Sequence, residues 1–218
     1  MYQYLKIIST QSSRSLTIFA LIVGILMSCQ GPYEEVVTKD EAGNIASTYT
    51  IRKEDGVKHG NYQVFMAEKL SESGNFKDGK QDGIRKFLFP NGNIEVEETY
   101  KDGSILAKKV FFENGELSVK GQYDEAVTMS GEWTFYYQNG KIKEIVNFKN
   151  SAENGSFKEY YENGNIKAEG TYAPLQLGVE VVGVEQGELK EYNENGELIA
   201  KKNCELGRCE TIWTKEMK

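Results

Sequence analysis

The residues that could do acid–base or nucleophilic chemistry are few and scattered along this chain. His59 is the only histidine, and it stands in a polar, glycine-containing stretch before Gly60. Three glutamates, Glu113, Glu162 and Glu194, each precede an Asn-Gly pair, a setting typical of a turn. Catalysis needs a nucleophile or base held next to the groups that orient it. We therefore predict no catalytic residues and no cofactor, and keep a hydrolase with paired carboxylates as the enzyme alternative.

The first 28 residues have the layout of an export signal. Lys6 and Arg14 give this stretch positive charge, and an apolar run of twelve residues follows at 16–27. Such a run suits the apolar region of a signal peptide and is short for a bilayer span. It ends in Leu26-Met27-Ser28-Cys29, which resembles the lipobox of bacterial lipoproteins.

The lipobox resemblance implies that the signal peptide (1–28) is cleaved before Cys29 and that the Cys29 thiol carries lipid. Several acyl chains on one residue would hold the protein on a membrane. Residues 29–40 are predicted to form a tether, because they lack the repeat described below. Glu34 and Glu35 resemble the acidic surface-export signals of some bacterial lipoproteins, which favours an outer-membrane or cell-surface location. An uncleaved signal anchor with an incidental cysteine is the alternative.

The other two cysteines, Cys204 and Cys209, are separated by four residues that include a glycine. In an exported protein an even pair is expected to form a disulfide, and the two sides of a tight hairpin lie within reach of each other. The alternative is two reduced thiols. We predict no metal site, because two more ligands would be needed and His59 is far away in the sequence.

The charge of the chain restricts its partners. Without residues 1–28 the chain has 24 basic and 33 acidic residues, a net charge of −9. Such a chain repels phosphate backbones and anionic lipid headgroups. We therefore expect no nucleic-acid partner.

A glycine-containing turn recurs along the chain with a period near 24 residues. Its glycines stand at Gly43, Gly92, Gly115, Gly140, Gly164 and Gly196. The first step, of 49 residues, leaves room for one degenerate repeat near residues 66–69, and the last contains an eight-residue insertion. Asn-Gly between aromatic or aliphatic runs is a strong hairpin signal, and it predicts type I′ turns.

The best-preserved units are Gly131-Glu-Trp-Thr-Phe-Tyr-Tyr-Gln-Asn-Gly140 and Gly155-Ser-Phe-Lys-Glu-Tyr-Tyr-Glu-Asn-Gly164. This pattern resembles the MORN repeat in its bacterial variant, over about residues 41–212. The fold class that follows is all-β: an elongated antiparallel meander of six or seven stacked hairpins, preceded by a signal-peptide helix, with the repeat domain at 41–218. Each hairpin buries its apolar face against its neighbours.

One segment interrupts the repeat. Between Tyr172 and Gly187 lie fourteen residues, in which Leu175, Leu177, Val179 and Val181 alternate with less apolar residues, as in a half-buried strand. A longer hairpin could pack back on its own sheet. If it projects instead, these four residues form a candidate partner site.

The function predicted from the sequence is that of a noncatalytic lipoprotein, anchored to a bacterial membrane through lipid on Cys29, which presents a β-repeat surface to a protein partner. The alternative is an antitoxin or immunity protein, since proteins resembling this one often carry that label. An acidic surface would suit a basic toxin.

Overall fold

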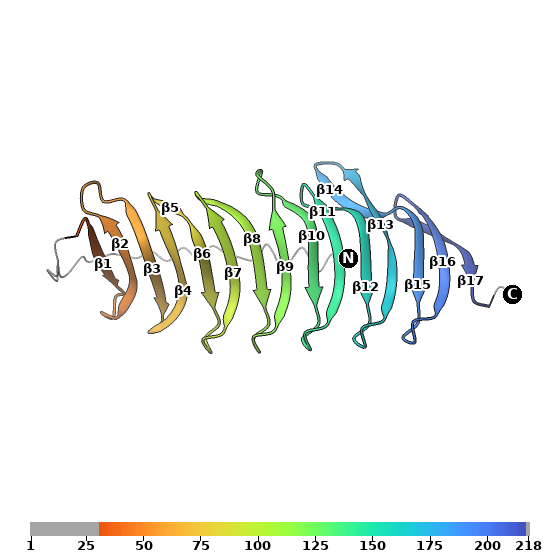
Figure 1. The fold of residues 1–218 in the computed structure, drawn as a ribbon, viewed down its shortest axis with the longest axis horizontal. Coiled ribbons are helices and arrows are strands. Elements are labelled where there is room, and N and C mark those ends of the chain that lie inside the picture. Colours follow the sequence, from red (N-terminus) through yellow and green to blue (C-terminus); the bar gives the residue numbers. More distant parts are fainter. Residues whose placement is uncertain (1–30, 217–218) are drawn as a thin grey trace.

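The computed structural model describes residues 31–216, and it consists of one antiparallel sheet of seventeen strands with no helix among these residues (Figure 1). Each strand pairs with the next along the chain, apart from two short additions, β5 beside β4 and β14 beside β13. The elongated meander predicted from the repeat is therefore confirmed. The signal peptide at 1–28 and Cys29 lie outside the described residues.

The strands follow one another at regular intervals. They are β1 (Tyr33–Lys39), β2 (Ile45–Arg52), β3 (Lys58–Met66), β4 (Lys69–Lys77), β5 (Lys80–Gln81), β6 (Gly83–Leu88), β7 (Ile94–Lys101), β8 (Ser104–Phe111), β9 (Leu117–Tyr123), β10 (Met129–Tyr136), β11 (Ile142–Lys149), β12 (Ala152–Tyr160), β13 (Ile166–Leu177), β14 (Glu180–Glu185), β15 (Gly187–Tyr192), β16 (Leu198–Glu205) and β17 (Arg208–Thr214).

The tether predicted for residues 29–40 is wrong over 33–39, which form β1. This strand pairs with β2 from Tyr33 opposite Arg52 to Lys39 opposite Ile45. The reason is the Gly43 turn. A hairpin turn joins two paired strands, so the residues before this turn pair with the side of β2 that β3 does not occupy. The sheet therefore begins four residues after Cys29.

The core lies on one face of this single-layered sheet, which we call the core face. Trp133, Val146 and Phe157 stand side by side on it, because they are paired across β10, β11 and β12. Because no second layer covers this face, the rings of Trp133 and Phe157 pack flat against glycines of adjacent strands. A Cβ added to Gly121 would come within 2.0 Å of Trp133, and one added to Gly170 within 2.9 Å of Phe157. Trp133 is only 1% exposed as a result.

On β6, β7 and β8, charged side chains occupy the core-face positions at which aromatic rings stand further along the sheet. Glu98 on β7 stands between Arg85 and Lys108 in register. Its carboxylate is 3.3 Å from Lys108 Nζ and accepts a hydrogen bond of 2.9 Å from Tyr100. Glu98 is buried, and these partners compensate its desolvation.

The Asn-Gly turns are not the predicted type I′ turns. At Asn139-Gly140 only the glycine has positive φ (+80°), and its N–H donates to Tyr137 O at 2.9 Å. The register shifts by one residue next to this turn. This combination is a type I turn followed by a glycine bulge. Paired positive φ values, the mark of type I′, occur instead at Ala67-Glu68 between β3 and β4 and at the opposite edge, as in Asp78-Gly79 and Asp102-Gly103.

The asparagine of these turns keeps an ordinary backbone conformation, and in three of them its side chain makes two hydrogen bonds. Asn163 Oδ1 accepts the N–H of Asn165 at 2.8 Å, and its Nδ2 donates to Glu194 O, in the next turn, at 2.7 Å. Asn91 and Asn114 make the same two kinds of contact, each reaching the turn that follows. The turns are thereby joined into a ladder along one edge of the sheet.

The ladder explains why these positions are asparagine and predicts the effect of Asn163→Asp. Aspartate keeps the acceptor for Asn165 but loses the donor and sets a carboxylate oxygen against Glu194 O. We expect a loss of about 1 kcal/mol in the free energy of unfolding, measured by denaturant titration. Asn195→Asp is the control, because it makes the same substitution in the last Asn-Gly turn, where no turn follows and Asn193 Oδ1 accepts the N–H of Glu197. Equal losses in both variants would contradict the ladder.

Candidate functional site

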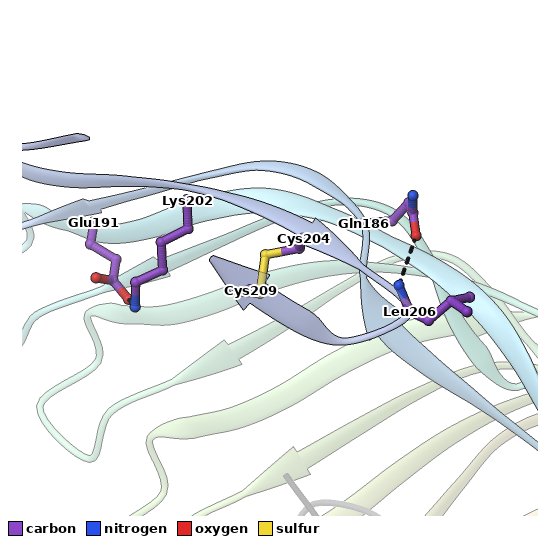
Figure 2. The surroundings of a disulfide bond; sticks show 6 residues. All are labelled: Gln186, Glu191, Lys202, Cys204, Leu206 and Cys209. Carbon is purple, nitrogen blue, oxygen red and sulfur yellow. Dashed lines mark hydrogen bonds and ion pairs between the residues drawn. A yellow bond between two sulfur atoms is a disulfide. The ribbon is translucent and has the colours of Figure 1, made fainter. Parts of the chain in front are cut away.

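The predicted disulfide between Cys204 and Cys209 joins β16 to the last strand, β17 (Figure 2). The two residues are paired in register, and a turn at Leu206-Gly207 connects the strands. The turn is held to the preceding strands, because Leu206 N–H donates to Gln186 Oε1 at 3.2 Å and Gly207 N–H to Glu185 O at 3.1 Å. The disulfide thus fastens the C-terminal edge of the repeat sheet.

The insertion forms a two-stranded projection, which we call the extension hairpin (residues 173–184). The first half of β13 pairs with β12 and β15, whereas its second half pairs only with β14. Figure 1 shows this part rising above the upper edge of the sheet, in blue. Its base is packed, since a Cβ added to Gly183 would come within 2.3 Å of the Glu153 side chain on β12.

The tip of the extension hairpin is exposed, but its four predicted residues do not share one face. Gly178, with φ of +63°, turns the chain between Leu177 and Glu180. Leu175 and Leu177 therefore lie on one face, while Val181, opposite Gln176, lies on the other. The alternation is interrupted because the segment is a hairpin and not one continuous strand. Val179 at the turn is 100% exposed, Leu177 51% and Val181 46%.

A cavity of about 270 Å³ opens on the core face at the base of this hairpin. It lies where Ala168 on β13 stands in register between Glu159 on β12 and Glu191 on β15. The short alanine side chain leaves a gap between the two glutamates. Apolar and aromatic residues line the gap: Phe157, Tyr161, Tyr172, Leu189, Tyr192 and Ile199. Its charged lining residues are Glu159, Lys167, Glu185 and Glu191.

Carboxylates crowd this part of the core face and perturb one another. Burial raises the pKa of Glu144 to about 7, with a further contribution from Glu159 and Glu153. Burial and the nearby Glu185 also raise the pKa of Glu153. The pKa of Tyr172 is raised by burial first and then by these carboxylates, Glu144 foremost. The region therefore has a negative potential that its lysines offset only in part.

Sequence reasoning missed this cavity, although one signal for it was present. The glutamates considered there, before the Asn-Gly pairs, lie in turns. Glu159 and Glu191, which line the cavity, lie within strands. Glu159 is two residues from Phe157 in β12, and Glu191 is two residues from Leu189 in β15. In a strand this spacing places side chains on the same face.

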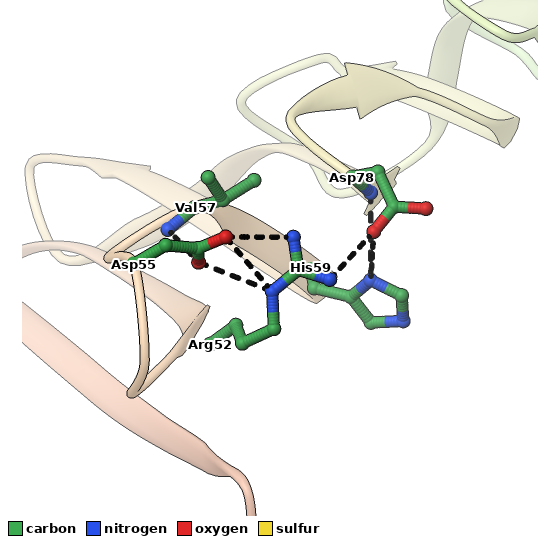
Figure 3. A network of polar contacts seen from close by, with 5 residues as sticks. All are labelled: Arg52, Asp55, Val57, His59 and Asp78. Carbon is green, nitrogen blue, oxygen red and sulfur yellow. Dashed lines mark hydrogen bonds and ion pairs between the residues drawn. The ribbon is translucent and has the colours of Figure 1, made fainter.

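His59 lies in a separate polar network near the first strands (Figure 3). Its Nδ1 accepts the N–H of Asp78 at 3.4 Å, and its ring stacks on Tyr33 at 4.9 Å. Arg52 reaches both Asp55, at 2.9 Å, and Asp78, at 3.0 Å. The hydrogen bond from Arg52 lowers the pKa of Asp55. These contacts tie β2 and β3 to the turn after β4.

Residues 31–216 contain no group of three His, Cys, Asp or Glu side chains arranged to hold a metal ion. Within the same range, no helix is long and apolar enough to cross a membrane.

Comparison with known families identifies the repeat. The model of the MORN repeat variant matches at residues 81–102, 129–150, 153–173 and 185–203. Each match falls on a hairpin of the sheet, centred on β6–β7, β10–β11, β12–β13 and β15–β16. The chain thus matches this repeat at four places. No curated protein matches the chain.

The raised pKa of Glu144 predicts a pH-dependent effect of Glu144→Gln. A folded-state pKa above the unfolded value of 4.5 means that the protonated form favours folding below about pH 4.5, an advantage lost as pH rises through 7. Relative to wild type, the variant should gain between about 1 and 3 kcal/mol of stability at pH 8 and nothing near pH 4.5.

Denaturant titrations at several pH values measure this difference. Glu132→Gln is the control, because Glu132 is exposed and, being next to Trp133 in β10, lies on the opposite face. A gain for Glu144→Gln that does not change with pH would contradict the electrostatic explanation.

Proposed function

We propose that this protein is a noncatalytic lipoprotein that binds a protein partner through the end of its repeat sheet. The observation that carries the proposal is the apolar tip of the extension hairpin. A monomeric repeat protein has no structural need for a projection with a fully exposed valine at Val179 and half-exposed Leu177 beside it. The MORN-type repeat, a binding repeat, supports the same role.

A lipid on Cys29 would set the orientation of the molecule. Because β1 begins at Tyr33, only residues 30–32 separate the lipid from the sheet, a span of at most about 14 Å from Cys29 to Tyr33. The extension hairpin lies eleven strand spacings further along, roughly 50 Å at about 4.8 Å per strand. The anchor would thus hold one end of the sheet at the membrane and leave the hairpin free to meet a partner.

An immunity protein or antitoxin is one particular form of this function. The excess of acidic residues favours a basic partner, and many toxins that attack nucleic acids are expected to be basic. A toxin encoded next to this protein would support that form.

Anchoring is tested by Cys29→Ala, because the proposal requires this thiol to carry the lipid. Cells labelled with a palmitate analogue should yield labelled wild-type protein and unlabelled variant. The double variant Cys204→Ala/Cys209→Ala should keep its label, which controls for the loss of any thiol. Equal labelling of Cys29→Ala and wild type would refute anchoring at this residue.

Partner binding is tested by Leu177→Ser/Val179→Ser, which removes the apolar tip and leaves the strands of the hairpin in place. Both side chains are exposed, so the melting temperature should remain within a degree or two of wild type. The proteins cross-linked to the wild type on cell membranes should be lost from the variant.

The control is Leu106→Ser/Ile212→Ser, which makes the same kind of change at two exposed apolar residues outside the extension hairpin, on β8 and β17. This control should keep the cross-linked partner. Retention of the partner by the tip variant would overturn the proposal, and a large fall in its melting temperature would assign the tip a structural role instead.

A further inference from the structure

We propose that the cavity at the base of the extension hairpin binds the side chain of an arginine or lysine from a basic segment of the protein partner. This inference rests on the proposed function and adds the chemistry by which the partner is recognised. It identifies a second contact region, on the core face, which neither the repeat match nor the exposed tip assigns.

The shape of the cavity suits one long cationic side chain. Its centre is the gap above Ala168, between Glu159 and Glu191, so an entering group meets a carboxylate on either side. Tyr161, Tyr172 and Tyr192 contribute aromatic surface to the same cavity. A guanidinium group stacks on aromatic rings and forms paired hydrogen bonds with carboxylates, and an ammonium group uses the same two contacts less specifically.

The charge around the cavity is left partly uncompensated. Lys167 Nζ lies 3.1 Å from the Glu159 carboxylate. Lys202 Nζ lies 2.6 Å from the Glu191 carboxylate, a pair drawn in Figure 2. No ion pair of this kind accompanies Glu144, Glu153 or Glu185 within residues 31–216. Burial is the main cause of the raised pKa values of Glu144 and Glu153, and repulsion from the neighbouring carboxylates raises them further. A bound cation would relieve this repulsion, whereas an anion would add to it.

The position of the cavity connects it with the extension hairpin. Tyr172 and Glu185 line the cavity and also form the register pair from which the hairpin extends. Val181 lies four residues from Glu185 in β14 and thus on the same face as the cavity, so a partner that covers the tip on the Val181 side comes close to the cavity as well. This continuity favours a protein side chain as the occupant over a free cation or a lipid headgroup.

The test uses the full-length protein and a blocked peptide with three arginines, measured by isothermal titration calorimetry at low and at high salt. The same peptide with citrulline in place of arginine keeps the shape and removes the charge. We expect the arginine peptide to bind, more weakly at high salt, and the citrulline peptide not to bind.

The matched variants compare equal losses of charge on the two faces. Glu159→Gln/Glu185→Gln alters the cavity lining and should weaken binding of the arginine peptide at least about tenfold, because it removes charge-assisted hydrogen bonds. Glu132→Gln/Glu210→Gln changes two exposed residues that alternate with core-face residues and thus lie on the opposite face. This control should retain wild-type affinity.

The inference would be overturned by no binding of the arginine peptide, by equal weakening in both double variants, or by binding of choline and phosphocholine in preference to the peptide. The last would assign the cavity to a lipid headgroup. The proposed function is tested separately by the tip variant. If the cavity variant still cross-links the partner while the tip variant does not, the function stands and only this inference fails.

Discussion

The structure depends on the contact between an aromatic ring and a glycine on the adjacent strand. A single-layered sheet has no second layer against which to bury apolar side chains, so each large side chain must find cover within its own face. Trp133 over Gly121, Phe157 over Gly170 and Tyr62 over Gly74 achieve this, because a glycine removes the side chain that would hold the ring away from the backbone. Each contact joins two neighbouring strands, and the stability of the sheet is therefore a sum of local contacts along its length.

The turns at the two edges of the sheet differ in backbone conformation and in the hydrogen bonds of their side chains. In the Asn-Gly turns the glycine alone takes up positive φ, and the side chains of Asn91, Asn114 and Asn163 each reach the turn that follows. Turns at the opposite edge vary more: Asn150-Ser151 and Leu206-Gly207 take positive φ at both positions, and one connection carries the extension hairpin. An insertion at this edge leaves the asparagine ladder intact, which explains why the projection is found there.

The repeat period predicted the meander well, because spacing and turn glycines are local properties of the sequence. The degenerate repeat near residues 66–69 is present as the hairpin of β3 and β4, with Ala67 and Glu68 in place of Asn-Gly. Two features escaped prediction for one reason: they depend on what lies across the sheet. The strand β1 forms because its residues pair with the free side of β2 across the Gly43 turn, and Val181 faces away from Leu177 because the chain reverses at Gly178. A pattern read along the chain contains neither fact.

The same contacts that stabilise the repeats also explain where they leave space. On the core face, residues paired across neighbouring strands form rows of side chains. Such a row leaves no gap where rings, aliphatic side chains or ion pairs such as Glu98–Lys108 fill it. Between β12 and β15 the row instead reads Glu159, Ala168, Glu191, so that a small residue stands where a large one would close the surface. The longest insertion begins on the same strand as this alanine. The gap above Ala168 and the extension hairpin thus arise from one strand, β13, and under the function proposed above they would offer a single partner two neighbouring contact regions.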